Sequence, residues 1–235
     1  MIEIKNVTKK YGAKTALDDV NFTIDDGEIF AFIGRNGAGK TTLIKAITGI
    51  HDFDEGDILI NGKSIKKEPV ACKKEMAYVP DNPELYENMR AIDFVNFVCD
   101  IYETPQEVRE KNIKRFAEMF DLTNNMNDTI NSFSHGMKQK VALIAALAHE
   151  PKVLILDEPF VGLDPKAVAD VKDVMRGIVK DGGTVFFSTH ILEVAEKLCS
   201  KVAIIKSGKL MRVGSMKEVK GDKGLEKVFL ELVEK

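Results

Sequence analysis

The sequence Gly34-Arg35-Asn36-Gly37-Ala38-Gly39-Lys40-Thr41 stands between an apolar run, Ile29 to Ile33, and an amphipathic segment, Thr42 to Thr48. This order of strand, glycine loop and helix is the context required by the phosphate-binding pattern, Gly followed by four residues and Gly-Lys-Ser/Thr. Such a loop points backbone N–H groups at a polyphosphate and adds the dipole of the helix. We expect Lys40 to reach the β and γ phosphates and the Thr41 hydroxyl to hold magnesium. The alternative is a structural glycine turn.

Length and composition narrow the possible classes of protein. A chain of 235 residues can form one large α/β domain, with or without an inserted subdomain. Its net charge of -3 lacks the basic excess of a dedicated nucleic-acid binder. The longest apolar run, Val141 to Ala148, is far shorter than the roughly 20 residues of a membrane helix, and the start, Met1 to Lys5, is unlike a signal peptide. We therefore expect a cytoplasmic protein, with Cys72, Cys99 and Cys199 as reduced thiols.

Acidic residues follow a second apolar run. Val153 to Leu156 has no polar alternation, which predicts a parallel strand buried on both faces, and it leads into Asp157 and Glu158. Ligands of open α/β sheets bind outside the carboxyl ends of the strands, so these acids and the glycine loop are expected to converge. His190 follows another predicted strand, Thr184 to Phe187, where a histidine is better placed for chemistry than most structural ones.

Two further residues have alternative interpretations. Tyr11, near the first strand, could stack on a nucleotide base or be a half-buried edge residue. Ser134 precedes an apolar-periodic helix, Met137 to Ala148, and could be an ordinary helix cap or a phosphate contact. Between them, Leu85 to Phe120 has helical spacing that predicts an inserted helical subdomain.

Five motifs in this order resemble those of the ATP-binding subunits of ABC transporters over nearly the whole chain. The matching segments are the glycine loop, Ser134 to Lys138 as the signature, Val153 to Glu158, Gly162 to Asp164 as the aspartate loop, and His190. The resemblance implies nucleotide contacts from Tyr11, Asn36, Gly37, Ala38, Gly39, Lys40, Thr41, Thr42, Ser134, Gly136 and Asp164. It implies magnesium contacts from Thr41, Asp81 and Asp157, catalysis by Glu158 as general base, and a γ-phosphate contact from His190.

The chain departs from the family pattern at two places. The signature usually begins Ser-Gly-Gly and here reads Ser134-His135-Gly136, with Met137 in place of the commonest glutamine, a variant that resembles export-type members. Asp81 stands where the family has glutamine, or glutamate in some exporters. The side chain of aspartate is one methylene shorter than that of glutamine or glutamate, and unlike glutamine it is charged. Both differences affect whether Asp81 can contact magnesium.

The resemblance also implies a fold. It is the α/β fold of phosphate-loop NTPases, with a mostly parallel sheet, an N-terminal antiparallel β edge and an inserted α-helical subdomain. Residues 1–235 would form one ATPase domain, with residues 1–84 and 150–235 as the nucleotide-binding core and residues 85–149 as the helical subdomain that carries the signature.

The implied function is ATP binding and hydrolysis that powers a membrane transporter, with export as the expected direction. Each ATP in the family lies between the phosphate loop of one subunit and the signature of another, so the chain is expected to form a homodimer or heterodimer. The other partner is a membrane-spanning subunit, which would hold the chain on the inner face of the membrane through a surface that includes Pro80, Pro83, Leu85 and Tyr86. No nucleic-acid partner is expected. The alternatives are a soluble ABC-type ATPase that acts on ribosomes or DNA, and a module that binds nucleotide without hydrolysing it.

Overall fold

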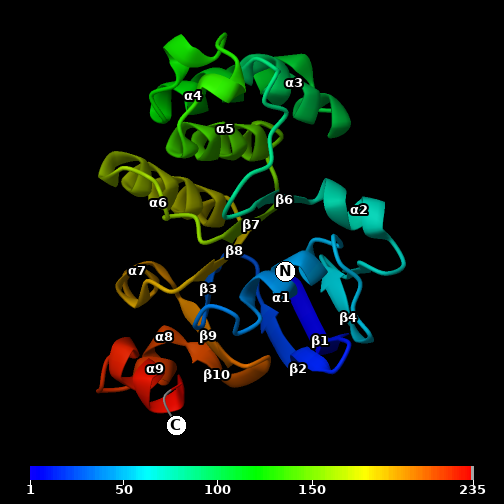
Figure 1. Cartoon of the computed structure of the whole chain (residues 1–235), viewed down its shortest axis with the longest axis vertical. Helices are drawn as coiled ribbons and strands as arrows, with labels where there is room; N and C mark the ends of the chain where they lie inside the picture. Colours follow the sequence, from blue (N-terminus) through cyan, green and yellow to red (C-terminus); the bar gives the residue numbers. More distant parts are fainter. Residues whose placement is uncertain (234–235) are drawn as a thin grey trace.

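Two β-sheets and a group of helices make up the part of the chain that the computed structural model describes, residues 1–233 (Figure 1). The helices α3, α4 and α5 lie together at one end of the long axis, and the C-terminal helices α8 and α9 lie at the other. No helix within residues 1–233 is long and apolar enough to cross a membrane.

The larger sheet has six strands in the order β10-β9-β3-β8-β7-β6. All neighbouring pairs are parallel except β9 and β10, which are antiparallel. Its strands are β3 (Ile29–Ile33), β6 (Met76–Val79), β7 (Val153–Asp157), β8 (Thr184–Thr189), β9 (Lys201–Lys206) and β10 (Lys209–Ser215). Every residue of β3, β7 and β8 is buried, which explains why the apolar runs show no alternation.

The N-terminal antiparallel strands form a sheet of their own, in the order β2-β1-β4-β5. They are β1 (Ile2–Tyr11), β2 (Lys14–Ile24), β4 (Glu55–Ile60) and β5 (Lys63–Ser64). The predicted Asn61-Gly62 turn joins β4 to β5, and both residues have positive φ, as a tight hairpin requires. Phe22 stacks on Phe30 of the parallel sheet with ring centroids 5.1 Å apart, so the two sheets share one apolar core.

The helices cover the parallel sheet and build the separate helical part. The core carries α1 (Lys40–Ile47), α2 (Pro69–Lys74), α6 (Pro165–Lys180), α7 (Leu192–Leu198), α8 (Met216–Lys220) and α9 (Leu225–Val233). The helical part consists of α3 (Ala91–Ile101), α4 (Gln106–Met119), the short 3-10 turns η1 (Thr123–Asn125) and η2 (Ile130–Ser132), and α5 (His135–Ala148).

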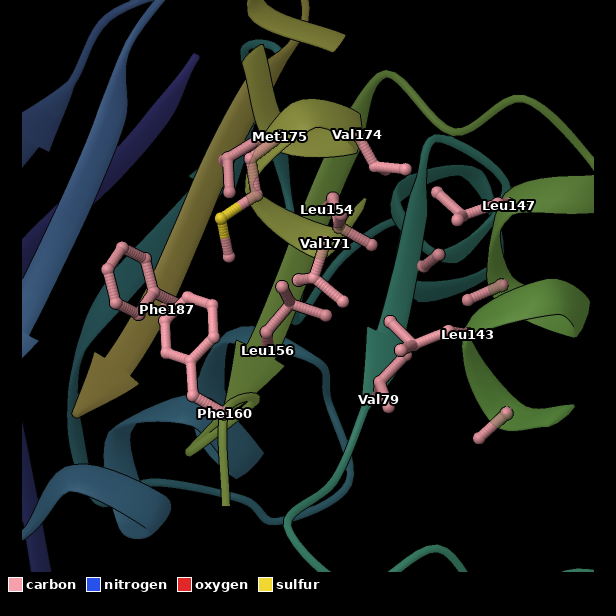
Figure 2. Close-up of a cluster of buried hydrophobic side chains, with 14 of the residues drawn as sticks. Val79, Leu143, Leu147, Leu154, Leu156, Phe160, Val171, Val174, Met175 and Phe187 are labelled. Atoms are coloured by element: carbon pink, nitrogen blue, oxygen red, sulfur yellow. The ribbon is translucent and has the colours of Figure 1, made fainter. Parts of the chain in front are cut away.

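A continuous apolar cluster fixes the helical part to the sheet. Figure 2 shows Leu143 and Leu147 of α5 facing Val79, while side chains of α6 cover Leu154 and Leu156 of β7. This contact positions the start of α5, and therefore Ser134, relative to the ends of the parallel strands.

The start of α3 differs from the sequence pattern. Helical spacing begins at Leu85, but α3 begins only at Ala91. The segment before α3 is held in a non-helical path because Arg90 forms a bridge with Thr129 and the carbonyl of Met89 accepts the N–H of Ile130. Residues 80–90 therefore form a long connection between β6 and the helical part.

Candidate active site

The glycine loop between β3 and α1 has a backbone that only glycine can follow at its end. Gly39 has φ +116°, and a Cβ there would lie 2.7 Å from the carbonyl oxygen of Ala16. Lys40 is the first residue of α1, and its buried Nζ donates to the carbonyl of Gly34 at 2.9 Å. The ammonium group is thus curled over the loop.

Asp157 ends β7 directly opposite the loop. Its Oδ2 accepts a hydrogen bond of 2.8 Å from the Thr41 hydroxyl, and its Oδ1 accepts one from the Ser188 hydroxyl. Ser188 is the neighbour of Asp157 in the register between β7 and β8. The carboxylate is almost fully buried, so these two hydroxyls fix its orientation.

Glu158 is held by three groups. Its φ of +48° is uncommon for a residue other than glycine, and its N–H donates to the Ser188 hydroxyl at 3.1 Å. Oε1 lies 3.1 Å from Lys40 Nζ. Oε2 accepts the N–H of His190 at 3.2 Å and lies 2.9 Å from His190 Nδ1. The two predicted catalytic residues and the phosphate-loop lysine are therefore in direct contact.

Lys40, Thr41, Asp157 and Glu158 line an open cavity of about 750 Å³, a volume within the range of small-molecule sites. The predicted site residues in its lining are Tyr11, Asn36, Gly37, Gly39, Lys40, Thr41, Thr42, Asp81, Asp157 and Glu158. The predicted residues Ala38 and His190 are not part of its lining. The lining also includes residues that were not predicted, namely Lys14, Thr15, Ala16, Ser207 and Gly208. Tyr11 is half-exposed, and its hydroxyl lies 3.1 Å from His51 Nδ1. The ammonium of Lys9 lies 5.1 Å from the centroid of the Tyr11 ring.

Asp81 belongs to the same cavity. Burial raises the pKa of its carboxyl, and the negative charges of Asp157 and Glu158 raise it further, while His135 and His190 oppose the rise. The three carboxyl groups thus make this end of the cavity strongly electronegative, which suits a cation.

The donor set fits magnesium bound with a nucleotide. Within residues 1–233 no group of three or more His, Cys, Asp or Glu side chains is arranged as an all-protein metal site. The Thr41 hydroxyl and the Asp157 carboxylate instead place two hard oxygens side by side. Magnesium is typically bound by one or two such protein ligands, with phosphate oxygens and water completing the octahedron.

The predicted signature and aspartate-loop residues lie elsewhere. Ser134 caps α5 by accepting the N–H of Met137 at 3.3 Å, and neither it nor Gly136 lines the cavity. Asp164 caps α6 and is paired with Lys140 at 2.9 Å. The N–H of Ala167, followed by Lys140, lowers the pKa of Asp164 to about 2.

The signature and the aspartate loop nevertheless touch each other. A Cβ at Gly136 would lie 2.9 Å from the carbonyl oxygen of Gly162. The predicted nucleotide contacts therefore fall into two groups on one chain: those around the cavity, and Ser134, Gly136 and Asp164 on a second surface.

Besides the lining residues that were not predicted, two residues that contact the site from outside its lining were also missed. Ser188 orients both Asp157 and Glu158, and its signal in the sequence is a hydroxyl at the end of an apolar strand next to the acids. His51 contacts Tyr11 from a loop 40 residues away, and nothing in the local sequence pattern indicates that contact.

Comparison with known proteins agrees with this geometry. The family model described as "ABC transporter" matches residues 17–161. The ABC-type transporter ATP-binding protein EcsA of Bacillus subtilis strain 168 is 33% identical over 99% of this chain and 96% of its own. The linearmycin resistance ATP-binding protein LnrL of the same organism is 34% identical, over 92% of this chain and 69% of its own. The methionine import ATP-binding protein MetN of Clostridioides difficile is 34% identical, over 97% and 74%.

Solved structures give the same result. A structure of an ATP-binding subunit of an ABC transporter matches with a TM-score of 0.95 at 33% identity, covering 99% of both chains. A dimeric ATP-binding cassette in a post-hydrolysis state with ADP and Pi matches with a TM-score of 0.83 at 27% identity, covering 92% of this chain and 99% of that one. The chain belongs to the ABC transporter family as one of its ATP-binding, ATP-hydrolysing subunits.

Proposed function

We propose that this subunit pairs with a second ATPase subunit across two ATP molecules and drives a membrane-spanning transporter, with export as the direction of transport. The observation that carries the pairing is the separation of Ser134 and Gly136 from the cavity of their own chain. One chain can enclose ATP on one side only. A second chain would supply its signature and aspartate loop to complete the site.

The residues around the cavity have distinct proposed roles. Thr41 and Asp157 would hold magnesium, with Asp81 as a further oxygen donor facing the same ion. Magnesium, when bound, offsets the charge that phosphoryl transfer spreads over the γ oxygens. Glu158 would accept the proton of the attacking water. Its side chain is only 12% exposed and its backbone is left-handed, and both features support this role.

Other residues would bind the nucleotide itself. Lys40 would leave Glu158 for the β and γ phosphates, and His190, already beside the Glu158 carboxylate, would contact the γ phosphate. The glycine-loop residues, from Asn36 to Gly39 with Thr42, would supply N–H groups. Tyr11 would stack on adenine, and its position at the cavity mouth supports this.

The membrane subunit would dock beside the connection between β6 and α3. A second, smaller cavity of about 180 Å³ lies there, and its walls include Pro83, Leu85 and Phe94. Tyr86 is 60% exposed, with its ring 5.7 Å from that of the exposed Phe97. Such a cleft with aromatic anchors suits a short helix with an apolar face. This attachment would place the chain on the cytoplasmic face of the membrane.

Co-purification from detergent-solubilised membranes of the source cells tests this proposal. Tyr86→Asp should keep the ATPase activity of the isolated chain but lose most of the membrane subunit, because a buried charge would be left without a partner. Val70→Asp, on exposed α2, is the matched control and should behave like the unmodified chain. Full recovery of a membrane subunit with Tyr86→Asp would refute the docking site. Recovery of the unmodified chain with ribosomes or DNA instead would refute the transporter.

Export is the finer part of the proposal. It is supported by the signature variant Ser134-His135-Gly136-Met137, whereas relatives named for resistance and for import match equally well. Inside-out vesicles that contain the co-purified complex should accumulate cargo when ATP is added. Accumulation in right-side-out vesicles loaded with ATP would show import.

A further inference from the structure

Gln139 is a fully buried polar side chain on α5 that none of the roles above uses. Its Nε2 donates to the carbonyl of Pro80 at 3.4 Å, whereas its Oε1 has no hydrogen-bond partner among residues 1–233. An unpaired amide oxygen in the interior is destabilising, and most buried polar atoms are paired. Because only one of its two polar atoms is hydrogen-bonded, packing alone does not explain a glutamine at this position.

The loop that follows Pro80 is held by the packing of the buried Pro83 and of Leu85, and not by hydrogen bonds of its own. Within the described chain, residues 81–85 make no hydrogen bond through backbone or side chain. Asp81 lines the nucleotide cavity and Leu85 lines the smaller cavity, so the loop joins two functional surfaces. The Gln139–Pro80 contact holds this loop at the point where it leaves β6.

The helix on the other side of the contact reaches the same surfaces. Ser134 begins α5, and Ala142 and Ala146, on the turns after Gln139, line the smaller cavity beside Leu85. Lys138 adds a second link to the connection through an ion pair with Glu87, whose side chain is exposed. Gln139 is therefore the buried link between the signature helix and the loop that carries Asp81.

We infer that Gln139 is a positioning residue for ATP hydrolysis. Its amide ties the Asp81 loop to α5, so that Asp81 in the cavity and Ser134 at the signature change position together. Its unpaired Oε1 is the acceptor for the free N–H groups of the loop when the loop closes toward the nucleotide. This role is internal to the ATPase and holds whether or not the chain serves a membrane transporter.

The test uses the isolated full-length chain and the variant Gln139→Met, which keeps the volume of the side chain and removes both polar atoms. We expect kcat to fall about five- to tenfold, as loss of one buried hydrogen bond in the reacting arrangement predicts. KM for ATP and the Kd for ADP should stay within about twofold, because Gln139 does not line the cavity. Combined with Glu158→Gln, the variant should also form less ATP-dependent dimer on a sizing column.

The matched control is Glu87→Gln, which breaks the exposed ion pair with Lys138 and leaves the buried amide in place. Its kcat should match that of the unmodified chain, because exposed ion pairs contribute little. If Gln139→Met does not fold, Gln139→Asn replaces it, since the shorter side chain cannot reach Pro80. An unchanged kcat in the Gln139 variant, an equal loss in Glu87→Gln, or a parallel loss of ADP binding would overturn the inference.

Discussion

Glu158→Gln should tighten ADP binding as well as abolish turnover. Lys40 Nζ and Glu158 Oε1 are 3.1 Å apart, and the exposed fractions of their side chains are only 7% and 12%. In the proposed role of Lys40, phosphate groups would have to take its ammonium away from this carboxylate. The amide of glutamine at position 158 would bind the Lys40 ammonium less strongly than the carboxylate does. The side chain of residue 158 would therefore compete less with phosphate for that ammonium.

The size of this effect follows from the contact. At 3.1 Å and an effective dielectric of 20, the gross attraction of the two charges is about 5 kcal/mol. Most of it is offset by desolvation, and the net value of a hydrogen bond to a charged group is about 1.5–3 kcal/mol. An amide oxygen keeps roughly half of that, so about 1 kcal/mol is lost. We therefore expect ADP to bind about fivefold more tightly.

Calorimetric titration with ADP in EDTA separates this effect from others. ADP has no γ phosphate to support pairing of two subunits, and without magnesium the carboxylate has no metal contact to lose. Asp81→Asn is the matched control because it removes a carboxylate of the same cavity that makes no contact with Lys40. Asp81→Asn should change the Kd for ADP less than Glu158→Gln does.

Turnover of Glu158→Gln should fall about 10² to 10⁴-fold, because an amide cannot accept the proton of water. Equal or weaker ADP binding in this variant would refute the reasoning about the ion pair. A rate like that of the unmodified chain would refute the assignment of Glu158 as base.

Three further changes test other parts of the structure. Gly39→Ala forces φ +116° on alanine and brings its Cβ to 2.7 Å from Ala16 O, so calorimetry should detect at least tenfold weaker ADP binding. Ser134→Arg should prevent ATP-dependent dimers on a sizing column while the isolated chain still binds ADP; loss of ADP binding would mean that Ser134 supports the local fold. Burial lowers the pKa of His149 to about 4, so the unfolded chain binds an extra proton between pH 4 and 6.5. Urea unfolding should show about 2 kcal/mol less stability at pH 5 than at pH 7, and His149→Phe, which keeps the ring stacked on Tyr102, should remove that difference.

The fold was predictable because its central strands are marked in the sequence. The apolar run from Val153 to Leu156 indicates a strand buried on both faces, and the glycine loop after Ile33 indicates the adjoining helix. The separation of the antiparallel strands into a second sheet was not predictable, because strand pairing between β1 and β4 depends on residues more than 40 positions apart.

Residue types predicted which side chains would converge, but not the contacts between them. Lys40, Asp157 and Glu158 were expected to converge because each follows the carboxyl end of a parallel strand. The pairing of Lys40 with Glu158 depends on a left-handed φ that no sequence pattern announces. Gln139 illustrates the same limit, because a glutamine between two lysines suggests solvent, whereas α5 is covered by the sheet on one side and by α3 and α4 on the other.

The close contact between Gly136 and Gly162 has a consequence for the proposed dimer. Because a Cβ at Gly136 would lie 2.9 Å from the Gly162 carbonyl oxygen, the signature and the aspartate loop have no room to move toward each other. The ion pair between Lys140 and Asp164 spans the same two elements. A second subunit would therefore meet both loops as one surface, and the ion pair between Lys140 and Asp164 would resist a shift of α5 that withdrew Ser134 from the partner's ATP without the aspartate loop. Gly136→Ala should accordingly weaken ATP-dependent pairing while the exposed cap residue Ser134 remains in place.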